Sequence, residues 1–144
     1  MNEVEIPNSV GYIGDDAFKE CNGLIEITIP GSVKEIEFEA FANCTSLSDI
    51  TMEDGLEKIG FGVFSGCSSL EKIIIPRSVD TIEAMAFGSC GSLKEITIPR
   101  NTNNIGELLF WGTDNLNTIN VYCNSVGKTY VEENYPEKEL NVIH

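Results

Sequence analysis

Four cysteines stand at equal spacing along the chain, and their thiols have the clearest capacity for disulfide or metal chemistry. Cys21, Cys44, Cys67 and Cys90 follow one another at intervals of 23 residues. Thiols that a fold brings within bridging distance can form disulfides, and clustered thiolates can bind zinc. No C-x-x-C pair accompanies them, however, and the single histidine, His144, is the last residue. We therefore expect a column of reduced, buried thiols that pack as small apolar groups.

The remaining polar residues do not form a pattern typical of an active site. A lone terminal histidine leaves Ser-His-Asp and Cys-His arrangements without their base. Adjacent acids occur at Asp15-Asp16, Glu53-Asp54 and Glu132-Glu133, on expected turns or an expected terminal helix, and none stands in an EF-hand loop. Cys123 lies outside the thiol column and is the better candidate for a reactive thiol. We predict no catalytic, cofactor-binding or metal-binding residue, and hence no enzyme.

The spacing of the cysteines also orders the apolar residues, which indicates a repeat protein. In each unit a leucine, or Met1 in the first unit, is followed three and five residues later by apolar residues, as in Leu24, Ile27 and Ile29. A spacing of two places both isoleucines on one face of a strand. Strands that recur in one direction pair in parallel, because each return needs a crossover of a dozen or more residues. Proline follows the strand in four units and should end the ladder, since it has no N–H. These prolines are Pro7, Pro30, Pro76 and Pro99.

The second half of the unit carries the pattern Ala-Phe-x-x-Cys in units one, two and four, with Val63 in place of alanine in unit three and Leu109 and Thr113 in place of alanine and cysteine in unit five. Ala17 and Cys21 lie four residues apart, on one face of a helical turn, with Phe18 beside them. A helix is about 10 Å wide whereas paired strands lie about 4.8 Å apart, so a layer of helical turns would spread one side of the stack. The predicted fold is an α/β solenoid, with a parallel β-sheet on its concave face and short helical or 3-10 turns on its convex face. We expect Phe38 and Phe61 to form an apolar patch on the convex face.

The unit reads Leu-x-x-Ile-x-Ile-Pro-x-Ser-Val-x-x-Ile-x-x-x-Ala-Phe-x-x-Cys-x-Ser and resembles the bacterial leucine-rich repeat of the BspA-like, or treponemal, type. The resemblance covers residues 1 to about 121. Unit three departs from it at Glu53 and Gly55, and unit five at Thr102 and Thr113. The resemblance implies a right-handed leucine-rich-repeat arc. It also implies an extracellular or cell-surface protein that adheres to host or matrix proteins, although no signal peptide is visible in this chain.

The repeats and the residues after them define two predicted parts. The repeat domain is 1–121, with units 1–23, 24–46, 47–69, 70–92 and 93–115 and a sixth strand at 116–121; residues 122–144 form a C-terminal cap. Asn124-Ser125 can begin a helix over Val126–Tyr135, and a strand over Leu140–Ile143 should follow. The side chains expected to cover the last repeat are Tyr130, Val131, Tyr135, Leu140 and Trp111. No such lid is evident at the first strand, which is therefore available for self-association or for a further part of a longer array.

The charge narrows the classes of partner. The formal net charge is −14, from 23 acidic and 9 basic residues. Proteins that bind nucleic acids present basic surface, so this balance argues against a phosphate-backbone partner and equally against anionic membranes. A charge of this size favours solubility in an elongated, surface-rich protein. No run of about 18 or more apolar residues is present, so no membrane insertion is expected.

The strand residues that alternate with the buried ones form the predicted binding face. They differ from unit to unit while the core columns stay constant, a contrast typical of solenoids that offer an extended recognition surface. A threonine row also suits strand propensity without any partner. We predict a non-catalytic protein-binding module, or alternatively a spacer array that displays another domain and has no ligand of its own. The predicted concave-face residues are Glu26, Thr28, Asp49, Thr51, Lys72, Ile74, Glu95, Thr97, Thr118 and Asn120.

Overall fold

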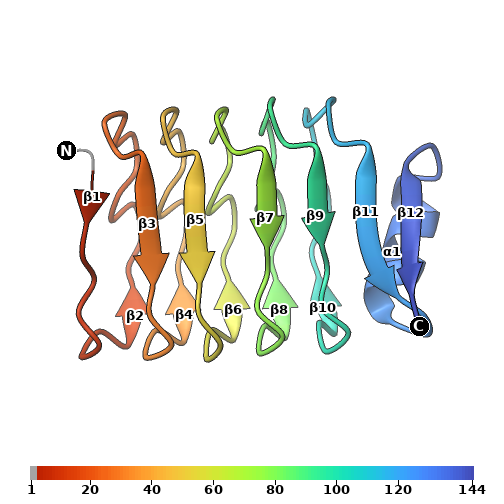
Figure 1. The fold of residues 1–144 in the computed structure, drawn as a ribbon, viewed down its shortest axis with the longest axis horizontal. Helices are drawn as coiled ribbons and strands as arrows, with labels where there is room; N and C mark the ends of the chain where they lie inside the picture. The colour runs from red at the N-terminus through yellow and green to blue at the C-terminus, as the bar shows by residue number, and fades with distance from the viewer. Residues whose placement is uncertain (1–2) are drawn as a thin grey trace.

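The computed structural model describes residues 3–144, and it shows a solenoid in which each repeat forms one coil (Figure 1). The coils stack along the long axis, with the N-terminal strand at one end and the C-terminal segment at the other. Each coil has a front strand, a turn, a short rear strand and a run of turns that leads to the next coil. The front strands are β1 (Glu3–Val4), β3 (Glu26–Ile29), β5 (Asp49–Met52), β7 (Lys72–Ile74), β9 (Glu95–Thr97) and β11 (Thr118–Tyr122).

The front strands pair in parallel and in the register of the repeat. Ile27 of β3 lies opposite Ile50 of β5, and Ile73 of β7 lies opposite Ile96 of β9. Inward positions hold the aliphatic columns, and most of these side chains are fully buried. The predicted parallel solenoid is therefore confirmed.

Proline limits the front ladder as the sequence predicts. β3 ends at Ile29, directly before Pro30, whereas Glu53 stands at the equivalent position after β5. The Glu53 N–H donates to the Ile29 carbonyl (3.0 Å), a bond that proline could not form. The loss of proline in unit three therefore lengthens the pairing between β3 and β5.

A second parallel sheet lies behind the first and was not predicted. It consists of the two-residue strands β2 (Tyr12–Ile13), β4 (Glu35–Ile36), β6 (Lys58–Ile59), β8 (Thr81–Ile82) and β10 (Asn104–Ile105), joined in the order β10-β8-β6-β4-β2. The isoleucine of each pair points inward and belongs to a column that the sequence assigned to the core. Two residues are too few to show an alternating pattern, so only the column was visible in the sequence.

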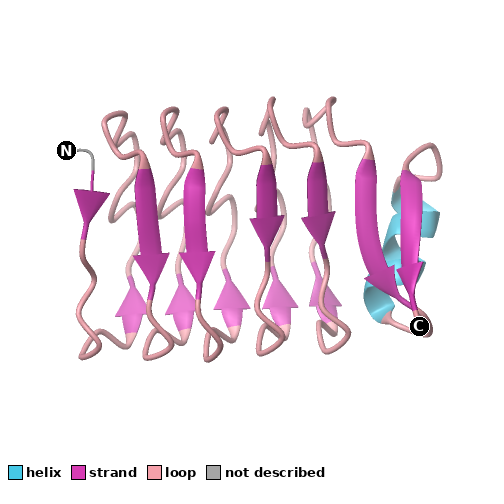
Figure 2. Ribbon diagram, viewed as in Figure 1, coloured by secondary structure: helices cyan, strands magenta, loops and turns pink. Residues whose placement is uncertain are grey.

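The Ala-Phe-x-x-Cys segments are hydrogen-bonded turns, and the prediction of one-turn helices or 3-10 segments is wrong for the described residues (Figure 2). The Phe18 N–H donates to the Ala40 carbonyl of the next coil (2.7 Å), and the Phe41 N–H donates to Val63 in the same way (3.0 Å). The turns therefore stack by backbone hydrogen bonds, as strands do. These turns are not helices, so no layer wider than the strand spacing spreads this side of the stack. The expectation of a concave strand face rested on such a layer, and that physical reason does not hold.

Two residues in each of these turns have positive φ, that is, a left-handed backbone conformation. One column is Asp16, Glu39, Gly62, Met85 and Leu108, and the other is Glu20, Asn43, Gly66, Ser89 and Gly112. Most of these residues are not glycine, although the left-handed region is unfavourable for other side chains. The mixed residue types explain why the sequence did not reveal these turns.

The core is built from columns that run along the whole stack. Adjacent phenylalanine rings stack at centroid distances of 5.0 Å between Phe18 and Phe41 and 5.6 Å between Phe41 and Phe64. Aromatic pairs of this kind add about 0.5–1.5 kcal/mol beyond their buried area. Phe38 and Phe61 also stack, at 5.3 Å, on the outside of the turns, as predicted for the apolar patch.

The C-terminal end is closed by a helix and a strand where the sequence predicted them. α1 (Val126–Asn134) begins after Ser125, whose hydroxyl accepts a hydrogen bond from the Lys128 N–H, and β12 (Glu139–Ile143) pairs with β11. The Tyr130 hydroxyl donates to the Gly106 carbonyl at 2.8 Å and accepts from the Leu109 N–H. Burial raises the pKa of Tyr130 to about 12. The predicted covering role of Trp111 is wrong, because its side chain is 56% exposed.

Candidate protein-binding face

The outward side chains of β1, β3, β5, β7, β9, β11 and β12 form a single surface, which we call the strand face. The strand register arranges the ten predicted binding residues in two rows across it. The first row is Glu26, Asp49, Lys72, Glu95 and Thr118, and the second row is Thr28, Thr51, Ile74, Thr97 and Asn120. Each row advances by one strand per repeat, so neighbouring side chains are held at strand spacing on rigid backbone.

Nine of these ten side chains are at least partly exposed, and Asn120 is buried at 6% exposure. Its amide donates to Glu95 Oε1 (2.8 Å) and Thr97 Oγ1 (3.2 Å), and its Oδ1 accepts from Asn141 (2.7 Å). Asn141 belongs to β12, a strand outside the repeats, so the sequence columns could not reveal this contact. Asn120 holds the C-terminal end of the face together and is poorly placed for a partner.

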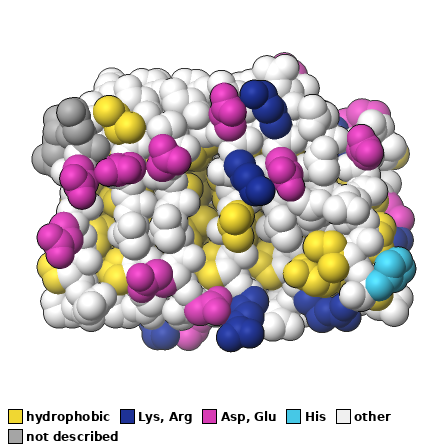
Figure 3. All heavy atoms as spheres, viewed as in Figure 1, with side chains coloured by type: hydrophobic (Ala, Val, Ile, Leu, Met, Phe, Trp, Pro, Cys, Tyr) yellow, Lys and Arg dark blue, Asp and Glu magenta, His cyan; other side chains and the backbone are white. Residues whose placement is uncertain are grey.

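The N-terminal half of the strand face is acidic. Glu3, Glu26 and Asp49 lie directly opposite one another on β1, β3 and β5. Together with Glu5 and Glu53 they line a shallow hollow of about 420 Å³. Figure 3 shows acidic side chains gathered over this end of the face. Like charges directly opposite across strands repel each other, so this half presents uncompensated negative potential.

The C-terminal half is internally compensated. Lys72 Nζ lies 3.7 Å from Glu95 Oε2, and Lys94 Nζ lies 3.4 Å from Glu71 Oε2. Both pairs are well exposed, so their contribution to stability is small. The strand face therefore divides into an acidic half and a half where basic and acidic side chains alternate.

The front sheet is interrupted between these halves. β3 pairs with β5, and β7 pairs with β9, but within residues 3–144 no ladder joins β5 to β7. Figure 1 shows a visibly wider step there than between the other front strands. A cleft of about 550 Å³ occupies this step, lined by residues 48–52, Ser69, Glu71, Lys72 and Ile74. The space-filling view shows apolar atoms inside this furrow (Figure 3).

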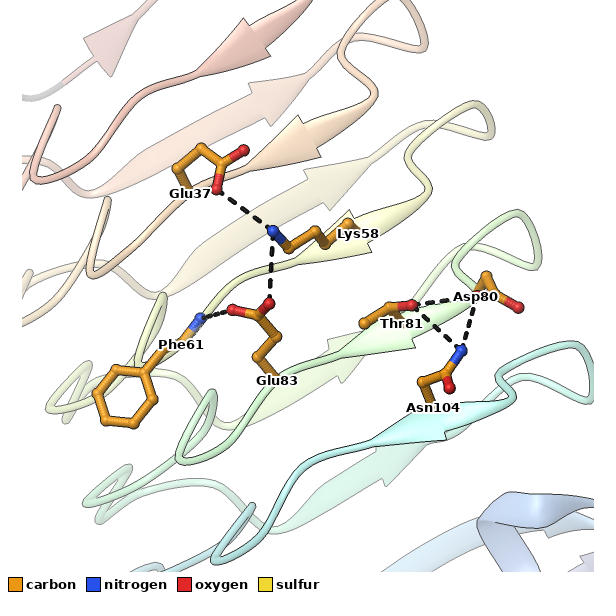
Figure 4. Close-up of polar contacts among 7 residues, drawn as sticks. All are labelled: Glu37, Lys58, Phe61, Asp80, Thr81, Glu83 and Asn104. Carbon is orange, nitrogen blue, oxygen red and sulfur yellow. Dashed lines mark hydrogen bonds and ion pairs between the residues drawn. The ribbon is translucent and has the colours of Figure 1, made fainter.

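The rear face carries polar contacts that satisfy one another (Figure 4). Lys58 Nζ lies 3.4 Å from both Glu37 Oε2 and Glu83 Oε1. Burial opposes the charge on Lys58, yet Glu83 and Glu37 outweigh it and raise its pKa. Glu83 also accepts a hydrogen bond from the Phe61 N–H (2.8 Å). These contacts stabilise the stack.

Asp80 is a second hydrogen-bonded centre on the rear face. It accepts hydrogen bonds from the Asn103 amide (2.8 Å), the Thr81 hydroxyl (3.0 Å) and the Asn104 amide (3.0 Å). Hydrogen bonds from Asn103, and then from Thr81, lower the pKa of Asp80. Both Lys58 and Asp80 are therefore held by contacts within the stack.

Burial is confirmed for three of the four cysteines in the column, whereas Cys21, in the first coil, is only partly buried; all five thiols are free. Cys44, Cys67 and Cys90 are fully buried, and each Sγ donates to the carbonyl of a phenylalanine in the preceding coil at 3.0–3.2 Å. Burial raises the pKa of Cys44 to about 11 and that of Cys90 to about 12. Thiols with such high pKa values are poor nucleophiles at neutral pH.

The described residues contain neither a metal-binding cluster nor a membrane-spanning helix. Within residues 3–144, no three His, Cys, Asp or Glu side chains lie together in a way that could hold a metal ion. In the same range, no helix combines the length and apolar character that crossing a membrane requires.

The stacked parallel strands and the repeated core columns define a leucine-rich-repeat solenoid of the bacterial type. A family model described as BspA type leucine rich repeat region matches six copies over residues 1–129. The chain belongs to this family. Among curated proteins, no sequence matches it.

Solved structures of bacterial proteins share the fold. The chain is 32% identical to the leucine rich repeat protein TpLRR of T. pallidum, with a TM-score of 0.80 over 82% of this chain and 57% of that one. It is 34% identical to a leucine rich cell surface protein from Faecalibacterium prausnitzii A2-165, with a TM-score of 0.83 over 90% of this chain and 34% of that one. A leucine-rich repeat protein from Bacteroides ovatus ATCC 8483, 24% identical with a TM-score of 0.77, covers 99% of this chain and 42% of its own. The chain thus spans 34–57% of the length of these relatives.

Proposed function

We propose that this protein is a non-catalytic protein-binding module and that its partner docks on the strand face. The observation that carries the proposal is the contrast between the two sides of each front strand. Inward positions repeat the same aliphatic residues, whereas outward positions change from Glu and Asp to Lys and from Thr to Ile along each row. Stiff strand positions with variable side chains are suited to recognition without a large ordering cost.

The cellular setting is part of the same proposal. One relative at 34% identity is described as a cell surface protein. We infer from that relationship a location at the bacterial surface, and we propose a host or matrix protein as the partner. The acidic half of the face favours a partner with a basic surface, because complementary potentials speed association and set its orientation.

The test is a pair of charge-reversal variants matched in charge. In the first, Glu3→Lys, Glu26→Lys and Asp49→Lys are combined on the acidic half of the strand face. In the second, Glu35→Lys, Glu57→Lys and Glu107→Lys change the net charge equally at exposed positions away from it. Binding to a panel of purified extracellular-matrix proteins should fall at least tenfold for the first triple and change little for the second. Both melting temperatures should stay near that of the wild type, because exposed charges contribute little to stability.

Equal loss of binding in both triples would point to a general charge effect and would contradict docking on the strand face. Retained binding in the first triple would contradict it as well.

A spacer array is the second candidate function. It is favoured by the observation that the chain spans only 34–57% of the length of its solved relatives and so corresponds to a part of those longer proteins. The outer edge of β1, which pairs only with β3 among the described strands, offers a site for self-association. Repeated failure of the wild-type protein to bind any protein in the panel would favour the spacer.

A further inference from the structure

The C-terminal segment closes the core of the last coil but leaves one edge of the front sheet open. Within residues 3–144, β12 pairs with β11 and with no other strand. The helix α1 packs behind the sheet, against β10 and β11. Figure 1 shows β12 as the last front strand of the stack, with α1 behind it. At this end the stack therefore presents a five-residue strand with a free edge.

The repeat fixes which backbone groups of β12 lie on that edge. Inward residues of a front strand donate toward the following coil, as the Ile98 N–H donates to a β11 carbonyl (2.9 Å). Outward residues face the preceding coil, and in β12 the Ile143 carbonyl accepts from the Cys123 N–H (3.0 Å). Leu140 and Val142 are the inward residues of β12, so their N–H and C=O groups turn toward the free edge.

β12 lacks the features that protect most edge strands from pairing with another chain. Lysine, proline or an inward-pointing charge commonly blocks such an edge. β12 reads Glu-Leu-Asn-Val-Ile, and its inward side chains, Leu140 and Val142, are apolar and only partly buried. At the opposite end, β1 has two residues and carries Glu3, with Glu5 directly after it. Of the two outer edges, that of β12 is thus the one at which another strand can pair over several residues.

The distribution of charge favours a second copy of this chain at the β12 edge. Residues 3–53 carry eleven acidic and two basic residues, whereas residues 122–144 carry four acidic and two basic residues. Two copies repel each other least when their weakly charged ends meet, because solvent and salt screen the charges that lie farther away. Contact between two β1 edges would instead bring Glu3 and Glu5 of both copies together.

We propose that two copies of this chain pair through β12, antiparallel, around a twofold axis at Asn141. This alignment places every residue of the strand opposite a residue of the second strand, and the same surface serves both copies. Leu140 of each copy would exchange N–H···O=C bonds with Val142 of the other, which satisfies the groups on both free edges. Glu139 would lie opposite Ile143 of the second copy, so no like charges face each other across the axis.

This pairing would join the two front sheets into one continuous sheet. Because the axis is perpendicular to the sheet, both strand faces would lie on the same side, with their acidic halves at the two outer ends. A partner with repeated basic sites could then bind both halves at once and gain avidity. The pairing itself goes beyond the proposed function and does not depend on it, since it is measured without any matrix protein.

The first part of the test is the mass of the chain in solution, measured by sedimentation over a range of concentrations. The mass should rise from that of one chain to that of two and then stay constant. Val142→Pro removes an N–H from the free edge and should weaken the association at least tenfold. Glu3→Pro, the matched control at the edge of β1, should leave it unchanged. A single-chain mass at every concentration, growth beyond two chains, or the same effect of both prolines would overturn the inference.

The second part traps the pair and does not rely on proline. Facing residues of a non-hydrogen-bonded antiparallel pair have Cα atoms about 4.5 Å apart, within the range of a disulfide. With oxidised glutathione, Asn141→Cys combined with Cys123→Ser should therefore form a covalent dimer. Thr28→Cys combined with Cys123→Ser, on the exposed strand face away from β12, should remain a single chain under the same conditions. Absence of the covalent dimer, or an equal yield from both variants, would overturn the inference even where Val142→Pro lowers the stability of the fold.

Discussion

At the scale of single residues, the cysteine column shows how one side chain can serve both packing and polar satisfaction. Each buried Sγ fills the inward end of a turn and donates to a phenylalanine carbonyl of the previous coil. Thr113 takes the same place in unit five, and its hydroxyl donates to the Phe87 carbonyl at 2.6 Å. Threonine can therefore replace cysteine at this position without loss of the hydrogen bond.

Alkaline pH should destabilise the protein through these thiols. The pKa of Cys44 is about 11 in the folded protein, against 9.0 for a free thiol, so the unfolded chain loses its proton first as pH rises. The stabilisation that the protonated Cys44 thiol gives the folded protein is fully present below about pH 9. As the pH rises to 11 it is lost, and the free energy of unfolding falls by an amount on the order of 2 kcal/mol. Chemical denaturation as a function of pH should show Cys44→Thr with a flatter alkaline profile than the wild type.

Cys44→Ala provides the matched control, since it neither titrates nor donates. Its alkaline profile should be as flat as that of Cys44→Thr, but its stability at pH 7 should be lower. Identical pH profiles for all three proteins would contradict the role of the buried thiol. Tyr130 also titrates with a raised pKa, and its contribution cancels in the comparison.

The sequence predicted burial correctly for columns of large apolar side chains, for which the core is the only favourable environment. Leu47, Ile73 and Phe64 repeat in register and are fully buried, as their columns required. Asn120 could not be predicted as buried, because its covering residue, Asn141, comes from a strand outside the repeat. The left-handed backbone conformation of Met85 and Leu108 could not be predicted either, since neither residue type favours positive φ.

At the scale of elements, each coil has three layers that advance together: front strands, rear strands and turns. The sequence predicted the first layer, because alternation over four residues is visible, and missed the second, because two residues carry no period. It assigned helical geometry to the third because Ala17 and Cys21 have helical spacing. Backbone hydrogen bonds between coils, such as Phe18 N–H to Ala40 (2.7 Å), favour stacked turns instead.

The turn that follows β5 should depend strictly on glycine. Gly55 has a φ of 130°, and a methyl group there would overlap the carbonyl oxygen of Gly31. Gly55→Ala should destabilise the protein by about 2–4 kcal/mol in chemical denaturation. Gly91→Ala, where an added methyl group meets nothing within 4 Å, should change stability by less than about 0.5 kcal/mol. Similar losses of stability for Gly55→Ala and Gly91→Ala would show that Gly55 does not approach the Gly31 carbonyl this closely.

The C-terminal cap should stabilise the last coil mainly through its tyrosines. Tyr130→Phe removes a donor to the Gly106 carbonyl and an acceptor for the Leu109 N–H. Thermal or chemical unfolding should show a loss of about 1–2 kcal/mol. Tyr12→Phe, at a side chain that is 68% exposed, is the matched control and should be neutral. An unchanged stability of Tyr130→Phe would mean that α1 is not docked through this hydroxyl.

At the scale of the whole molecule, the solenoid has two broad faces, and they differ in whether their charged side chains have partners among their neighbours. On the rear face, Lys58 and Asp80 are held by neighbours. On the strand face, Glu26 and Asp49 face each other without compensation, and one step of the sheet is open beside them. The sequence located this face through its variable positions but could not reveal the open step, because β5 and β7 carry the same inward pattern as their neighbours.

The most direct measurement of whether the strand face is the recognition surface is site-specific photo-crosslinking. A benzophenone amino acid is placed singly at Thr28, Thr51 or Thr97 on the strand face, and at Glu35 or Asn104 on the rear face, and each variant is irradiated with the same panel of matrix proteins. We expect covalent adducts with one protein of the panel from the strand-face positions, strongest at Thr51 beside the cleft, and none from the rear. Adducts of equal yield from both faces, or from the rear alone, would contradict recognition by the strand face.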